Sequence, residues 1–424
     1  MNAKTFKLLA LFLLVNHLLI TDINAQLYSV VVETPGYNPY SEVFNNAENS
    51  IDSFDSTNLR NHFPGVNENT AAVNAALNYR GLPMEFELVP NSSEVRFRVP
   101  SLGIDETFSA ATRDASLDLL VDFLQKDGGQ ITNDISKTLA KTTATDPIAG
   151  NPNSLMSTQV SNVFASSFFG TGTGTGTGTG SGTGSGSGSG SGFGSGSGGL
   201  DADNKWYLGI NLGNSTANDN LVQTITLPLS YTVNFDANPE HSLQISFPVS
   251  QTTINEEAKS YTLGTGLAYS FPASDSVRLT PGFTYGVVGS EDLASAAAAR
   301  SIFITTIYDF YLAGEDWRFG NTISASKTES LELDDISLDP EISNRIMVNG
   351  IIWKGLPVSW AYVELFLTDT RFFGDEIYSK QYNDIGFNIS NLNRSTYLFQ
   401  IGLTYQWTDR SDLEGWMFNT SSSF

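Results

Sequence analysis

Alternating apolar and polar residues run through the second half of the chain. In residues 260–271, Tyr261, Leu263 and Leu267 share one face, and the intervening positions are Ser, Thr, Gly and Ala. A period of two indicates β-strands whose two faces meet different surroundings. The pattern predicts strands near residues 205–213, 221–235, 242–250, 260–271, 277–288, 301–312, 316–326, 345–353, 358–367, 381–390, 396–407 and 413–424.

Two architectures produce such strands: a membrane barrel with its apolar face towards lipid, or a soluble sandwich with that face inside. The polar positions are mostly small and uncharged, and aromatic residues such as Trp206, Phe235 and Trp407 lie near strand ends. Longer connections (214–220, 251–259, 289–300, 327–344, 368–380) alternate with shorter ones (236–241, 272–276, 313–315, 354–357, 391–395). These features favour a mainly β chain with an antiparallel transmembrane β-barrel of about twelve strands over residues 205–424, its longer loops outside the cell.

The N-terminus has the pattern of a secretory signal peptide. Lys4 and Lys7 precede an apolar run over residues 8–20, and Ala25 ends a short polar stretch. The run is shorter than the roughly 20 apolar residues of a membrane-spanning helix, so cleavage is favoured over an uncleaved anchor. We therefore expect residues 1–25 to be a cleaved signal peptide and the protein to reach the cell outer membrane.

Between the signal and the barrel, the sequence predicts a small α/β domain over residues 26–165. Strands are expected at 27–33, 84–88 and 94–99, and helices around Leu120 and Ile135. Residues 146–155 have the composition of an ordered turn. Residues 170–199 are almost pure Gly, Ser and Thr, which predicts a flexible linker.

The end of the chain carries a more specific pattern. Residues 400–407 and the last predicted strand combine alternating aromatic side chains with a C-terminal Phe. This resembles the terminal signal that the outer-membrane assembly machinery recognises. The residues concerned are Gln400, Gly402, Tyr405, Trp407, Trp416, Phe418 and Phe424.

Signal, linker and C-terminal barrel together resemble an autotransporter β-domain. The resemblance covers residues 205–424 and implies outer-membrane lipid, periplasmic chaperones and the assembly machinery as partners. Autotransporters place a helix in the barrel just before the first strand, where this chain is rich in Gly and Ser. We therefore expect residues 26–165 to stay in the periplasm.

Composition and motifs limit the partners and the kinds of site that we expect for this chain. A net charge of −23 argues against a nucleic-acid partner, and the absence of Cys leaves no disulfide framework. His62 and His241, the histidines beyond the signal, fall in predicted loops, and no His/Cys metal spacing occurs. The sequence predicts neither an enzyme nor a cofactor or metal site.

Charged residues recur on predicted lumen faces, where they would form a structural network or set ion selectivity, and we favour the network. They are Arg278, Asp309, Arg318, Glu364 and Asp384. The functions left open are a translocator or surface-display protein, a structural envelope protein, a narrow passive pore with a periplasmic domain, and a soluble secreted β-sandwich that binds carbohydrate. The sequence gives no oligomeric state.

Overall fold

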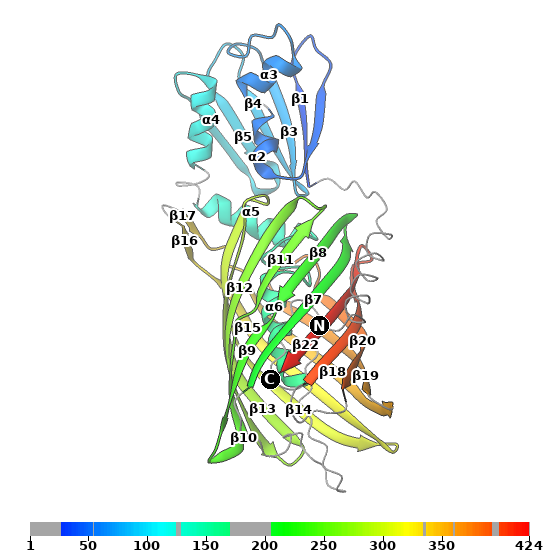
Figure 1. Cartoon of the computed structure of the whole chain (residues 1–424). Helices are drawn as coiled ribbons and strands as arrows, with labels where there is room; N and C mark the ends of the chain where they lie inside the picture. Colours follow the sequence, from blue (N-terminus) through cyan, green and yellow to red (C-terminus); the bar gives the residue numbers. More distant parts are fainter. Residues whose placement is uncertain are drawn as a thin grey trace.

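The computed structural model describes residues 27–53, 55–123, 129–169, 205–333, 336–358, 361–391 and 398–423. They form an N-terminal unit stacked on one end of a β-barrel (Figure 1). The predicted signal peptide, the Gly/Ser/Thr linker and Phe424 lie outside the described residues. Within those ranges, no helix is both long and apolar enough to cross a membrane.

The N-terminal unit is a six-stranded antiparallel sheet with the order β2-β1-β3-β4-β5-β6. Its elements are β1 (Tyr28–Glu33), β2 (Tyr40–Phe44), α2 (Ala47–Asp52), α3 (Ser56–His62), β3 (Val73–Tyr79), β4 (Leu82–Leu88), β5 (Val95–Val99), a 3-10 turn (Pro100–Leu102), β6 (Ile104–Phe108) and α4 (Arg113–Asp122). Alternate residues of the central strands, such as Leu77 and Phe97, are buried under Leu59 and Leu120 of the helices. The other face of the sheet carries polar and charged residues.

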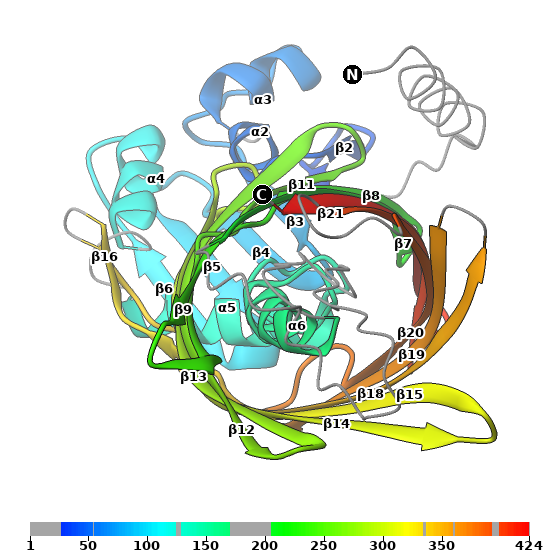
Figure 2. The ribbon, with the colours of Figure 1, turned by 60° about the horizontal axis from the view of Figure 1, so that its bottom comes forward.

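Two further helices follow this unit: α5 (Gly129–Thr142) and α6 (Leu155–Phe168). The segment α5 lies at the end of the barrel, and α6 lies inside the ring of strands (Figure 2). The sequence predicted α5 but not α6, and it assigned most of α6 to the N-terminal domain. In the structure α6 packs within the barrel instead.

The barrel is a closed antiparallel ring of twelve strands, as predicted. Its elements are β7 (Lys205–Ala217), β8 (Asn220–Leu227), β9 (Leu229–Phe235), β10 (Asn238–Ser246), β11 (Val249–Ile254), β12 (Ala258–Ser274), β13 (Val277–Ser290), β14 (Ser295–Leu312), β15 (Glu315–Glu329), β18 (Ser343–Val358), β19 (Ala361–Gly374), β20 (Gln381–Asn391), β21 (Leu398–Thr408) and β22 (Leu413–Ser423). Pro228 divides one strand into β8 and β9, and Phe247-Pro248 divides another into β10 and β11. The ring closes where β22 pairs with β7.

The faces of the barrel have the polarity of a membrane protein. Outward apolar side chains such as Leu263, Leu267, Ile302, Ile323 and Ile385 are 48–62% exposed. Inward polar side chains such as Ser301, Thr305, Thr322, Thr368 and Thr404 are at most 2% exposed. A soluble sandwich would reverse this polarity. The structure therefore confirms an outer-membrane β-barrel and contradicts the sandwich alternative.

Aromatic side chains gather at both ends of the outer surface. The Trp206 and Tyr231 rings, at one end, are 4.7 Å apart, and the Tyr405 and Trp416 rings, at the other, are 4.9 Å apart. Interfacial aromatic girdles of outer-membrane barrels occupy these positions. The apolar band between the girdles is the surface that meets lipid.

The two ends of the barrel differ in their connections. We call the end beside the N-terminal unit the domain rim; it carries connections 218–219, 255–257, 291–294, 330–342, 375–380 and 409–412. The opposite rim carries turns such as 236–237, 275–276 and 313–314. Most connections are shorter than predicted because the strands extend further. The longest connection, which contains the hairpin β16 (Leu331–Leu333) and β17 (Ile336–Leu338), lies at the domain rim.

Candidate functional site in the barrel lumen

Helix α6 enters the lumen from the domain rim and packs mainly against β12–β15 and β18. Phe164 and Phe168 stack on each other and lie over Gly320 and Gly350. A Cβ atom on Gly320 would come within 2.4 Å of the Phe168 ring, and one on Gly350 within 2.6 Å. These two glycines therefore let the aromatic face of α6 sit directly on the barrel wall.

Polar contacts fix α6 along its length. Gln159 Nε2 donates to the Ala299 carbonyl at 2.9 Å, and the Ser161 and Tyr382 hydroxyls are 2.9 Å apart. At the C-terminal end, Arg318 Nη1 donates to the Phe168 carbonyl at 2.9 Å. A cation on the last carbonyls of a helix favours its dipole. The lumen is thus built to hold a helix.

Three of the predicted lumen charges lie on the wall that carries α6. Arg318 donates two hydrogen bonds to Asp309, at 2.7 and 2.9 Å, and Lys354 Nζ donates to the same carboxylate at 2.8 Å. Arg278 lies apart from this cluster and donates to the Glu240 carbonyl at 2.8 Å. Sequence reasoning identified Asp309 and Arg318 but missed Lys354, whose position beside them depends on strand register.

The other two predicted charges lie elsewhere on the wall. Asp384 accepts from Thr368 Oγ1 and from Gln406 Nε2, each at 2.7 Å. Glu364 is opposite Lys354 in register and is 6% exposed. Arg278, Asp309 and Arg318 thus lie on β13–β15, and Glu364 and Asp384 lie on β19 and β20.

The turn between α5 and α6 is anchored at the domain rim by Asp146. Its carboxylate accepts from the backbone N–H of Ile148 at 2.9 Å and of Ala149 at 3.2 Å. Arg80, from the β3–β4 hairpin, donates to the same carboxylate at 3.1 Å. Burial raises the pKa of the Asp146 carboxyl above its usual value, while the Arg80 charge and the backbone donors lower it. The predicted turn at residues 146–155 is confirmed.

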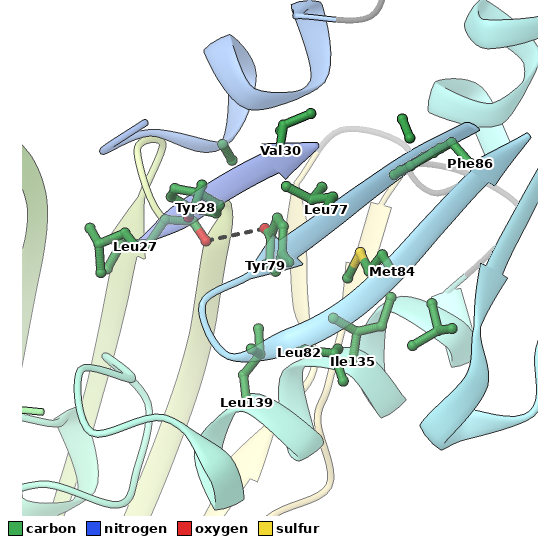
Figure 3. Close-up of a cluster of buried hydrophobic side chains, with 14 of the residues drawn as sticks. Leu27, Tyr28, Val30, Leu77, Tyr79, Leu82, Met84, Phe86, Ile135 and Leu139 are labelled. Atoms are coloured by element: carbon green, nitrogen blue, oxygen red, sulfur yellow. Dashed lines mark hydrogen bonds between the residues drawn. The ribbon is translucent and has the colours of Figure 1, made fainter. Parts of the chain in front are cut away.

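The N-terminal unit meets the barrel through the β13–β14 connection. Tyr28 donates to the Asp292 carbonyl at 3.1 Å, and Tyr79 to the Leu293 carbonyl at 3.4 Å. Figure 3 shows Tyr28 and Tyr79 hydrogen-bonded at the base of the sheet. Leu293 is fully buried in the same apolar cluster as the sheet. The unit is therefore packed onto the rim as well as tethered to it.

A second connection holds α5 and the turn. In loop 375–380, the Tyr378 N–H donates to the Ala140 carbonyl at 2.9 Å, and the Ser379 N–H donates to the Gly150 carbonyl at 3.0 Å. Gly150 has φ +93°, and a Cβ atom there would lie 2.4 Å from the Ala140 carbonyl. Only glycine fits this position without displacing the loop.

The path of the chain overturns one reason for expecting the N-terminal unit in the periplasm. The sequence predicts a periplasmic N-terminal unit partly because the segment before the first strand is rich in Gly and Ser and not in helix-forming residues. Helix α6 does occupy the lumen, on the N-terminal side of the Gly/Ser/Thr segment. The N-terminal unit consequently sits at the rim opposite to the one where β7 begins.

A cavity of about 40 Å³ lies between α6 and the wall formed by β8 and β10–β13. Asn162, Thr226 and Thr284 line it. At roughly 10–15 Å³ for each water, it holds about three water molecules. Helix α6 is thus a plug inside the lumen.

The predicted assembly residues divide between the two faces of the last strands. Those on the outer surface are Tyr405, Trp407, Trp416 and Phe418; those on the lumen side are Gln400 and Gly402. Phe424 lies outside the described residues.

Neither histidine lies in a loop as the sequence predicted. His62 ends α3 and stacks on Tyr40, with ring centroids 3.6 Å apart. His241 lies on β10, where its Nδ1 is 2.6 Å from the Tyr269 hydroxyl.

No protein-family model matches this chain, and no curated protein sequence matches it. Solved structures match the barrel. The translocator domain of the autotransporter NalP from Neisseria meningitidis is 11% identical, with a TM-score of 0.40, covering 53% of this chain and 90% of that one. The β-domain of the Bordetella autotransporter BrkA is 9% identical, with a TM-score of 0.41, covering 53% and 99%.

A porin also matches. The NanC porin is 12% identical, with a TM-score of 0.35, covering 51% of this chain and 98% of that one. At such low TM-scores, these likenesses carry no functional argument.

Proposed function

We propose that this chain is an outer-membrane protein that displays its own N-terminal unit at the cell surface, after which α6 fills the barrel. The path of α6 carries the proposal. The N-terminal unit lies at the domain rim, β7 begins at the opposite rim, and α6 runs through the lumen between them. No catalytic step is involved.

The side of each rim follows from the connections. Outer-membrane barrels have short periplasmic turns and longer extracellular loops. Turns such as 275–276 and 313–314 lie at the opposite rim, and the longest connection, 330–342, lies at the domain rim. The domain rim is therefore assigned to the outside of the cell, together with the N-terminal unit.

The N-terminal unit is too wide to cross this lumen folded. Six strands spaced about 4.8 Å apart span roughly 24 Å. The lumen holds α6, and a helix is about 10–12 Å in diameter with its side chains. The unit must consequently cross as an extended chain and fold on the far side.

A passive pore has less support. Helix α6 and its aromatic contacts lie inside the lumen, and the cavity beside α6 holds about three water molecules. A structural envelope role alone would not explain a helix threaded through the barrel.

We also propose that β21 and β22 present the assembly signal. Tyr405, Trp407 and Trp416 form an aromatic cluster on the lipid side of these strands. Replacing the three by Ser is expected to lower the amount of assembled barrel, measured by heat-modifiable migration in gels. Normal assembly of that variant would contradict the assignment.

A reversible covalent lock tests the display proposal. The chain has no Cys, and Val31 and Ala76 are partners in the β1–β3 register. The V31C/A76C variant should form a disulfide in the oxidising periplasm. We expect its N-terminal unit to reach the surface, as measured by protease digestion of intact cells, only when reductant is added.

The single V31C variant is the control and should be displayed with or without reductant. Equal display of the oxidised double variant would contradict crossing as an extended chain. An unlocked unit that protease on intact cells never reaches would contradict display itself.

A further inference from the structure

Polar side chains without a hydrogen-bond partner line the arc of the lumen wall that α6 does not cover. Among the described residues, both amide atoms of Asn388 and of Gln400, and the amide nitrogen of Asn211, have no partner. These side chains are at most 4% exposed. Their chain neighbours Phe387, Phe399 and Ile210 face outward, so the amides point into the lumen.

Two of these residues, Asn388 and Asn211, belong to one continuous row of lumen positions that crosses five strands. In register, Asn388 of β20 is opposite Gly402 of β21, Gly402 is opposite Asn419 of β22, and Asn419 is opposite Asn211 of β7. Thr226 of β8 follows Asn211. We call these five residues the amide row; Gln400 lies two positions from Gly402 on β21.

Gly402 lets the amides approach one another. A Cβ atom at this position would lie 2.3 Å from Asn388 Oδ1 and 2.4 Å from Asn419 Oδ1. The amide side chains therefore extend across the glycine instead of being separated by a side chain.

The amide row and α6 are centred on different arcs of the wall, and α6 reaches β20 only near its start, at the Ser161–Tyr382 contact among the described residues. Helix α6 packs mainly against β12–β15 and β18, whereas the row runs over β20–β22, β7 and β8. The wall under α6 carries apolar side chains, including Ile346, Val348 and Ile352, together with polar ones such as Ser301 and the unpartnered amide of Asn344. The lumen thus has one wall for the helix and one wall of amides.

Stability of the finished barrel does not explain the unpartnered amides of Asn388, Gln400 and Asn211. A buried polar group without a partner loses its hydration and gains nothing in return. Unpartnered buried groups are few in native proteins, and each one needs a reason. A partner that is present at another stage of the protein's life supplies one.

We propose that the amide row is a contact surface for the extended backbone of the protein's own N-terminal unit as that unit crosses the lumen. The inference rests on the proposed function and names the wall that the chain contacts. A primary amide offers one donor group and one acceptor group, as a peptide group does. It can therefore bond to any stretch of backbone, whatever the side chains.

The amide row is uncharged, and this suits the N-terminal unit as the segment that crosses the lumen. The N-terminal unit is itself acidic, with 14 Asp and Glu against 5 Lys and Arg over residues 27–123, and a cationic wall would hold it by charge. Amides replace the lost hydration of the backbone without trapping it. The cations Arg318 and Lys354 lie on the α6 arc and are paired with Asp309.

Display kinetics test the inference. In the N388L/Q400L variant, a hydrophobic isostere replaces unpartnered amides, so the finished barrel should keep or increase its melting temperature. Appearance of the N-terminal unit on intact cells should slow by roughly two- to tenfold, the effect of one or two lost hydrogen bonds.

The matched control is Q406L, on the same strand. Gln406 Nε2 donates to Asp384, so this variant should lower the melting temperature without slowing display. An N388L/Q400L barrel that melts lower and displays at the normal rate would make the amides structural and overturn the inference.

A crosslink gives a second readout. The photo-crosslinker p-benzoylphenylalanine is placed at position 388 in the oxidised V31C/A76C variant, and at the outward position 387 as a control. Adducts with the N-terminal unit are expected at 388 and not at 387. Absence of these adducts, together with unchanged display, would mean that the amides only hold water, and would leave the proposed function intact.

Discussion

Arg80 and Asp146 form an ion pair in which both side chains are fully buried, with Nη2 3.1 Å from Oδ2. One partner comes from a hairpin of the N-terminal unit, and the other from the turn that leads α6 into the barrel. Arg80 also donates to the Leu293 carbonyl on the domain rim at 3.4 Å. Arg80 therefore joins the N-terminal unit, the turn before α6 and the barrel.

Removing the negative charge of Asp146 should loosen this junction. D146N leaves a buried guanidinium without its anion, which costs about 3–5 kcal/mol in comparable sites. The Asn side chain can still accept from Ile148 and Ala149. We expect a lower melting temperature and faster proteolysis of the N-terminal unit in the purified full chain. The control D105N, whose partner Arg96 is partly exposed, should change little; equal effects of the two would refute a special role for the buried pair.

A side chain at Gly150 should weaken the packing of the turn between α5 and α6 against loop 375–380. G150A places a methyl group against the Ala140 carbonyl and the Tyr378 N–H, at a backbone conformation that disfavours L residues. The denaturant midpoint of unfolding should fall, and the free energy of unfolding should decrease by about 1–3 kcal/mol or more. Gly36 has nearly the same φ with nothing within 4 Å, so G36A should lose less stability. Equal losses would mean that the crowding at Gly150 is unimportant.

A larger side chain at Gly350 should displace α6 from the wall and so open the lumen. G350V puts methyl groups where Phe164 and Phe168 lie, and Val is otherwise well suited to a strand. We expect single-channel conductance in planar bilayers to rise above that of the unmodified protein. G289V is the control, since nothing lies within 4 Å of that glycine. Unchanged conductance in G350V would show that α6 does not need this contact to stay in place.

The two faces of β12 should respond differently to a charge. Leu267 is 48% exposed on the outer surface, and Ala268 is its inward neighbour. L267R should cost roughly 2–4 kcal/mol if the position is near the middle of the lipid layer. A268R is expected to cost less, measured as the denaturant midpoint of refolding into vesicles. The reverse order would contradict the outward polarity of the strand.

The sequence predicted the barrel well because strand and membrane impose the same period of two. Residues such as Tyr261 and Leu263 had to face lipid, and Thr262 could not. Strand β3 also alternates, but its small residue Ala75 and its Asn positions made the pattern weak. The edge strand β6 contains Asp105 and Glu106, which hide its strand character.

Helix α6 was missed for a different reason. It contains many Ser, Thr and Asn residues, which are weak helix formers, and the lumen supplies the contacts that stabilise it. The spacing of Val160, Phe164 and Phe168 was the signal available in the sequence. The amide row could not be predicted, because polar lumen positions look alike until strand register brings Asn211 and Asn388 into one row.

Labelling of single cysteines on intact cells tests surface display most directly, since the chain has no Cys of its own. Asn38 is exposed on the N-terminal unit, Glu256 at the domain rim and Asp275 at the opposite rim. With a membrane-impermeant maleimide, N38C and E256C should react on intact cells, and D275C only after the outer membrane is opened. Labelling of D275C on intact cells, with N38C protected until the membrane is opened, would place the N-terminal unit in the periplasm and contradict display.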